Sequence, residues 1–172
     1  NFADGVSSEL NREGGKNKIS SLGFCLTHDS RDDVFNPTKG LLLGGTFDLA
    51  GGALGGDKDF YRLKIKGSYD IPLAGGSVLE YRLRAGVVDS YGDSDYVPIY
   101  ERFFAGGAYT IRGYNERKVG PLDPASNDPI GGDSMLVSNI EYIIPVIDFI
   151  KVAVFFDSGN VWPKIVDFGN GG

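Results

Sequence analysis

The chain has 172 residues, enough for one domain, and it contains 26 glycines, 11 phenylalanines and 9 tyrosines. This composition argues against a helical bundle, because glycine destabilises helix interiors and aromatic residues favour strands. The formal net charge of -6 argues against a nucleic-acid partner, since binding to phosphates needs a basic surface. One cysteine and one histidine exclude an internal disulfide framework and argue against a transition-metal site, so we expect no metal and no cofactor.

The apolar runs and the first residues of the chain lack the usual helical membrane-targeting signals. No apolar run reaches the roughly 18 residues that a transmembrane helix needs. The first residues, Asn1 to Asp4, lack the basic region and the apolar core of a signal peptide. We therefore expect a mature or internal part of a longer protein.

Alternation of apolar and polar residues is the main signal along the chain. In residues 61–73 the odd positions are mostly apolar and the even positions mostly charged, and residues 79–87 repeat this pattern. Side chains alternate between the two faces of a strand, so each segment predicts a strand with one apolar face. Ala74 to Ser77 lies between them and predicts a tight hairpin turn. The six predicted strands, in up-and-down order, are residues 20–27, 40–50, 61–73, 79–87, 134–144 and 151–161.

The predicted strands fit either a soluble sandwich or a membrane barrel, because both architectures use alternating strands. Their lengths favour the barrel: strands of eight to thirteen residues exceed the usual mode of about five or six. A tilted membrane crossing takes about 9–11 residues. Short and long connections alternate, which is also typical of outer-membrane barrels. The predicted fold class is therefore all-β, an antiparallel up-and-down transmembrane β-barrel, here a partial barrel of about six strands.

The longest irregular segment, residues 106–131, begins within one sequence motif and is followed by two others. Residues 103–114 read Phe-Phe-Ala-Gly-Gly-Ala-Tyr-Thr-Ile-Arg-Gly-Tyr, residues 139–142 read Asn-Ile-Glu-Tyr, and residues 155–162 read Phe-Phe-Asp-Ser-Gly-Asn-Val-Trp. In these elements and in their order the chain resembles the BamA-like outer-membrane protein insertase superfamily. That superfamily includes bacterial assembly proteins, two-partner-secretion transporters, and mitochondrial and chloroplast relatives. Residues 1–172 would then be a C-terminal portion of the barrel domain, without its periplasmic repeats and remaining strands.

The resemblance implies a candidate site on the long sixth extracellular loop of the family. That loop folds back into the barrel lumen, and its arginine, which matches Arg112, contacts acids on the wall. Glu141 and Asp157 stand at the matching acidic positions, and strand alternation turns both away from the lipid-facing aromatic residues beside them. A guanidinium can engage carboxylates with two parallel hydrogen bonds, which fixes its orientation. The predicted lumenal tether comprises Arg112, Gly113, Tyr114, Glu141 and Asp157, with Gly106 and Gly107 as loop glycines that permit close approach of the backbone.

The resemblance also implies a function, a location and partners. The first hypothesis is a factor that folds and inserts other β-barrel proteins into the outer membrane of a Gram-negative bacterium. Its partners would be unfolded outer-membrane proteins, the lipid bilayer and accessory assembly lipoproteins. The alternative is a polypeptide secretion pore of the two-partner type, which would carry the same motifs. Six strands cannot close the sixteen-strand barrel that the resemblance implies, so the chain would form only part of that barrel.

A third, enzymatic hypothesis rests on one short motif. Asp157-Ser158-Gly159, preceded by Phe155 and Phe156, also resembles the aspartic-protease signature. That catalysis needs two carboxylates close enough to share a proton, and the chain contains no second copy of the motif. We therefore expect no enzymatic activity.

Overall fold

The computed structural model describes residue 14, residues 17–147 and residues 149–165. Six strands dominate it, and three short 3-10 turns lie in the connections. The strands are β1 (Ser21–Asp29), β2 (Gly40–Ala50), β3 (Phe60–Pro72), β4 (Val78–Ser90), β5 (Ser134–Ile147) and β6 (Ile150–Trp162). The 3-10 turns are η1 (Gly52–Leu54), η2 (Ala74–Gly76) and η3 (Ile99–Glu101).

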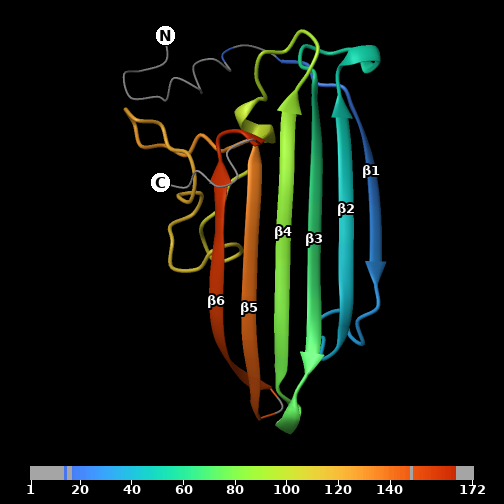
Figure 1. Cartoon of the computed structure of the whole chain (residues 1–172), viewed down its shortest axis with the longest axis vertical. Coiled ribbons are helices and arrows are strands. Elements are labelled where there is room, and N and C mark those ends of the chain that lie inside the picture. The colour runs from blue at the N-terminus through green and yellow to red at the C-terminus, as the bar shows by residue number, and fades with distance from the viewer. Residues whose placement is uncertain (1–13, 15–16, 148, 166–172) are drawn as a thin grey trace.

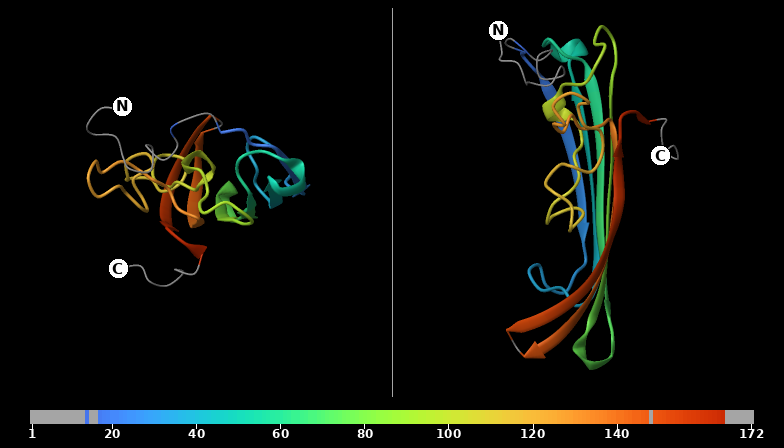
Figure 2. Two further views of the ribbon diagram at one scale, coloured as in Figure 1. Left: turned by 90° about the horizontal axis from the view of Figure 1, so that it is seen from above. Right: turned by 90° about the vertical axis from the view of Figure 1, so that its left-hand side faces the viewer.

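All six strands belong to one antiparallel sheet in the order of the sequence (Figure 1). The predicted up-and-down order is thus confirmed, and the predicted strands match the observed ones apart from their ends. The sheet is twisted and curved, and the segment that connects β4 to β5 lies against one of its faces (Figure 2). We call this face the inner face and the opposite one the outer face. A curved up-and-down sheet of this kind is a section of a barrel wall.

The outer face is apolar because the register places the apolar positions of neighbouring strands side by side. Phe24 lies opposite Phe47, Phe47 opposite Leu63, and Leu63 opposite Val87. No layer of the described chain covers this face, so its side chains are exposed. Large side chains exposed on it include Leu22, Phe24, Leu26, Leu43, Phe47, Leu63, Ile65, Tyr69, Tyr81, Ile140, Val152, Val154 and Phe156.

The inner face carries the charged positions of β3 and β4 together with a small core. This core lies where the segment between β4 and β5 packs on the sheet. Its buried members are Ala50, Phe60, Val88, Val97, Phe103, Ala105, Ile111, Val137 and Val161. Close packing of the segment depends on a missing side chain at Gly86, where a Cβ atom would come within 2.4 Å of the Phe103 ring.

The connections at the two ends of the sheet differ in length. The β3–β4 connection is the predicted tight turn: Leu73 N–H donates to Ser77 O over 2.8 Å, and Gly75 and Gly76 both have positive φ. The β4–β5 connection, residues 91–133, is far longer, and we call it the long loop. It contains the irregular segment predicted at residues 106–131.

In the described part of the chain, no helix is long and apolar enough to cross a lipid bilayer.

Candidate functional site: an arginine cluster under the long loop

Backbone hydrogen bonds between its outgoing and returning segments hold the long loop together. Isolated antiparallel bridges join Phe103 to Gly132 and Ala105 to Val119. Phe103 and Gly132 exchange both backbone hydrogen bonds, at 2.9 and 3.0 Å. The segments by which the loop leaves and rejoins the sheet therefore run side by side. The distal part of the loop lies near β5 and β6 (Figures 1 and 2).

Residues 106–114 form a closed turn at the distal end of the loop. Gly106 N–H donates to the Thr110 hydroxyl, which donates in turn to Gly106 O, both over 2.9 Å. Gly107 N–H donates to Tyr114 O over 3.1 Å and so closes the ring of backbone. Gly106 has a φ of 105°, and a Cβ atom there would lie 2.4 Å from Asn115 O. Glycine is therefore required here both for the backbone conformation and for the close approach.

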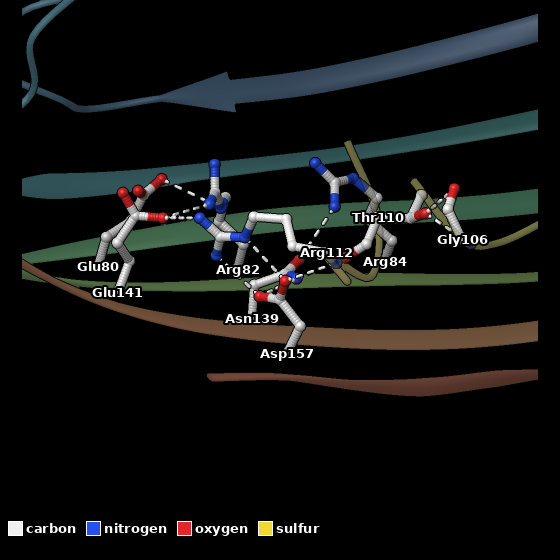
Figure 3. Close-up of polar contacts among 9 residues, drawn as sticks. All are labelled: Glu80, Arg82, Arg84, Gly106, Thr110, Arg112, Asn139, Glu141 and Asp157. Atoms are coloured by element: carbon white, nitrogen blue, oxygen red, sulfur yellow. Dashed lines mark hydrogen bonds and ion pairs between the residues drawn. The ribbon is translucent and has the colours of Figure 1, made fainter. Parts of the chain in front are cut away.

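Arg112 projects from this turn onto β5 and β6 (Figure 3). Its Nε and Nη2 donate to the two carboxylate oxygens of Asp157, each over 2.8 Å. Its Nη1 donates to Glu141 Oε2 over 2.7 Å, and its backbone N–H donates to Asp157 Oδ2 over 2.9 Å. Paired hydrogen bonds between a guanidinium and a carboxylate are among the strongest in proteins and fix the plane of the arginine. The structure thus brings together the three charged residues of the predicted site.

The contact is largely withdrawn from water. The side chain of Asp157 is 3% exposed, that of Glu141 17% and that of Arg112 23%. The ring of Phe155 covers the guanidinium, with Arg112 Cζ 3.4 Å from the ring centroid. Such a cation–π contact is worth more where water is excluded.

Asn139, which was not among the predicted site residues, adds a further hydrogen bond to Asp157. Its amide nitrogen donates to Asp157 Oδ1 over 2.8 Å and to Thr110 O over 2.7 Å. Asn139 is 3% exposed and lies directly opposite Asp157 in the β5–β6 register. The sequence carried a signal for it, because Asn139 shares a strand face with Glu141, two residues along β5.

Two further residues, on β4, extend the network and were also missed. Arg82 Nη2 donates to Glu141 Oε2 over 3.1 Å, and Arg82 Nε lies 3.6 Å from Glu80 Oε1. Glu141 therefore sits between two arginines, one from the wall and one from the loop. We call Glu80, Arg82, Arg112, Glu141 and Asp157 the arginine cluster. Charges of opposite sign alternate along it from β4 to β6 (Figure 3).

The remaining predicted site residues have backbone roles. Gly113 has a φ of 89°, and open space surrounds the position that a Cβ atom would occupy. Tyr114 contributes its carbonyl to the turn, while its ring is 62% exposed and lies outside the arginine contact. Among the described residues, no group of three or more His, Cys, Asp or Glu side chains could hold a metal ion.

Comparison with known proteins places this sheet and its loop in a family. The sequence pattern of the Omp85 superfamily domain matches residues 2–170. The chain belongs to the Omp85 superfamily. The resemblance inferred from the motifs is thereby confirmed for the family, whereas the role of the Arg-Gly-Tyr segment stays a prediction.

Named relatives of this Omp85 chain include a bacterial assembly factor and a fungal SAM50-like protein. It is 36% identical over 167 residues to the outer membrane protein assembly factor BamA of Nitratidesulfovibrio vulgaris, covering 96% of the chain and 21% of that protein. It is 30% identical over 144 residues to a SAM50-like protein of Schizosaccharomyces pombe, covering 82% of the chain and 30% of that protein. The chain thus spans between a fifth and a third of the length of these relatives.

A solved structure supports the barrel fold of the Omp85 chain. The crystal structure of Haemophilus ducreyi BamA lacking POTRA domains 1–3 matches it with a TM-score of 0.73 and 27% sequence identity. The match covers 83% of the chain and 30% of the BamA chain. The predicted fold class, a partial up-and-down barrel, is confirmed.

Proposed function

We propose that this chain is part of an outer-membrane β-barrel that folds and inserts other barrel proteins into the membrane. The observation that carries the proposal is the likeness, over almost the whole chain, to a protein named as an outer membrane protein assembly factor. The partners would be unfolded outer-membrane proteins and the lipid bilayer, with accessory assembly lipoproteins. Residues 1–172 would form a C-terminal portion of the barrel domain.

The proposed location is the outer membrane of a Gram-negative bacterium. The greater identity to a bacterial BamA, 36%, than to the fungal SAM50-like protein, 30%, favours a bacterial origin. The two faces of the sheet support a membrane position, because lipid would cover the exposed apolar outer face while the charged inner face would border a wet lumen. Strands β2 to β6, of 11 to 14 residues, are long enough to cross at a tilt.

In this proposal the chain supplies the wall that holds the long loop inside the barrel. Ordering the backbone of a loop costs roughly 1–2 kcal/mol per residue, so a long loop needs strong anchors to keep one conformation. Arg112 would be such an anchor, because its fork of donors meets two partly buried carboxylates on β5 and β6. A fixed loop would support the wall while another part of the barrel opens. An opened strand edge exposes unpaired N–H and C=O groups, which can pair with an incoming strand.

The test uses the full-length protein reconstituted in liposomes with an unfolded outer-membrane barrel protein as substrate. The measurement is the amount of substrate that becomes folded and protease-resistant in the bilayer. We expect Arg112→Gln to lower the folding rate by roughly tenfold, the factor given by a loss of about 1.4 kcal/mol. Arg117→Gln, which removes an exposed arginine from the same loop, is the matched control and should leave the rate unchanged.

Two results would contradict the proposal. The first is that the wild-type protein does not accelerate the insertion of any barrel substrate. The second is that it passes an extended polypeptide into the liposome lumen without inserting it. The second result would replace the assembly function with the secretion pore of the two-partner type.

A further inference from the structure

A second ion pair joins the long loop to the wall, away from the arginine cluster. Arg62 of β3 places Nη1 2.5 Å from Glu101 Oε2, and Glu101 closes the turn η3 near the start of the loop. The two side chains are 22% and 21% exposed. Pairs on an open surface contribute little, but partial removal from water strengthens the attraction between the charges.

A residue of the wall, Asp48, fixes the orientation of Arg62 independently of the loop. Asp48 of β2 lies directly opposite Arg62 in the register, and Asp48 Oδ2 accepts hydrogen bonds from Nε over 3.1 Å and from Nη2 over 3.0 Å. Its side chain is 20% exposed. Asp48 therefore occupies one edge of the guanidinium and leaves Nη1 directed at Glu101.

The backbone around Glu101 is also fixed. Val97 and Phe103 belong to the buried core on either side of it, and Pro98 is fully buried. Glu101 N–H donates to Pro98 O over 2.9 Å, and Arg102 Nε donates to Val97 O over 2.9 Å. Little conformational freedom remains to be lost when the Glu101 carboxylate meets Arg62, so the pair avoids most of the entropy cost of a pair between mobile side chains.

We propose that Glu101 is a second anchor of the long loop, acting through Arg62 and Asp48. The polarity is the reverse of the first anchor, because here the loop supplies the acid and the wall supplies the arginine. The Glu101 anchor holds the loop stem to β2 and β3, whereas Arg112 holds the distal turn to β5 and β6. The loop is thereby attached to both sides of β4, and loss of the Arg112 contact frees the distal turn while the stem stays in place. The attachment stands on its own geometry; its value for barrel assembly rests on the function proposed above.

The two anchors make separate predictions for amide hydrogen exchange. The stem contains protected amides at Glu101, Arg102 and Phe103, and the distal turn contains protected amides at Gly107 and Arg112. Exchange measured by mass spectrometry on peptides that span residues 97–105 and residues 107–118 therefore reports each anchor independently. The measurement uses the full-length protein in a bilayer nanodisc and does not depend on assembly activity.

We expect Glu101→Gln to speed exchange in residues 97–105 by roughly fivefold, which corresponds to about 1 kcal/mol, and to leave residues 107–118 unchanged. Arg112→Gln should give the opposite pattern. Glu116→Gln is the matched control: Glu116 is exposed on the same loop, and its substitution should change neither peptide. In an Arg62→Gln background, Glu101→Gln should add little, because the partner is already gone.

Unchanged exchange in residues 97–105 on Glu101→Gln would overturn the proposal. An equal effect of Glu101→Gln with and without Arg62 would also overturn it, because the anchor would then not act through Arg62. Loss of assembly activity without a change in stem exchange would argue against the second anchor and leave the proposed function intact.

Discussion

Arg112 is the residue at which the loop and two strands meet. It satisfies both oxygens of Asp157 and one oxygen of Glu141, and the Phe155 ring covers its plane. Lysine could replace it only in part. Its ammonium lacks the planar fork of donors with which the guanidinium binds two carboxylates in a fixed orientation. A buried ion pair is weak evidence for net stability, but removing one partner leaves the other charge desolvated and unpaired.

A double-mutant cycle measures this coupling. Arg112→Ala should destabilise the loop by roughly 2–3 kcal/mol, somewhat below the 3–5 kcal/mol typical of a fully buried pair because Arg112 keeps some exposure. In an Asp157→Asn background the same change should cost much less, and Arg112→Lys should restore only part of the wild-type value. The measurement is protease resistance of the loop in the folded full-length protein. Fully additive losses with both Asp157→Asn and Glu141→Gln would show that the pairs contribute nothing.

At the scale of elements, the strands could be predicted from the sequence because their side chains repeat with a period of two. The bounds of β2 match the prediction, whereas most other strand ends differ from it by one to three residues, since pairing with the neighbouring strand decides where a strand stops. β5 continues past Pro145 to Ile147, a stretch where the pairing with β6 shifts register. No period in the sequence marks such a shift.

For the long loop, the sequence predicted only the contacts of the Arg-Gly-Tyr motif and not the path of the rest of the loop. The family resemblance pointed to Arg112 and its acids, but Glu101 lies eleven residues earlier in a stretch without a recognisable pattern. Its pairing with Arg62 depends on how Val97 and Phe103 of the loop stem pack into the core with Val88 of β4, which is a property of the tertiary structure. Asn139 and Arg82 carried a weaker signal, because alternation placed each on the inner face of its strand.

The β1–β2 connection makes a prediction about pH. Asp32 accepts hydrogen bonds from the backbone N–H groups of Thr38 and Lys39 and from the Thr38 hydroxyl. These bonds favour the carboxylate and hold the pKa of Asp32 well below its usual range, with the Thr38 hydroxyl as the largest cause. A lowered pKa means that the stabilisation is complete above the unfolded value of about 4 and is lost as the pH falls toward the folded value.

A spin label at Val34 in a Cys25→Ser background tests this expectation. The label should be restricted at neutral pH and become progressively more mobile as the pH falls below about 4, because protonation of Asp32 in the opened loop increasingly competes with the hydrogen-bonded carboxylate. Asp32→Asn should give a mobile label with much less dependence on pH. Equal mobility of the wild-type label at neutral and acidic pH would refute the assigned role of Asp32.

At the scale of the whole molecule, one curved sheet separates two chemically different surfaces. The outer surface exposes large apolar side chains on every strand, such as Phe24 on β1 and Phe156 on β6. The inner surface carries the charged side chains, the arginine cluster and the docked loop. In water the outer surface would be an aggregation hazard, whereas in a bilayer it would meet lipid. The proposed membrane position therefore requires lipid at the outer face and water at the inner face.

Spin-label accessibility in the full-length protein in bilayers tests this claim most directly. Single labels at Leu63 and at Lys66, close together on β3 but on opposite faces, are introduced in a Cys25→Ser background. The account predicts that the label at Leu63 is relaxed by oxygen, which concentrates in lipid, and is shielded from a water-soluble nickel chelate. The label at Lys66 should show the reverse. Access of the nickel chelate to both labels would contradict the account, because the apolar face would then lie in water.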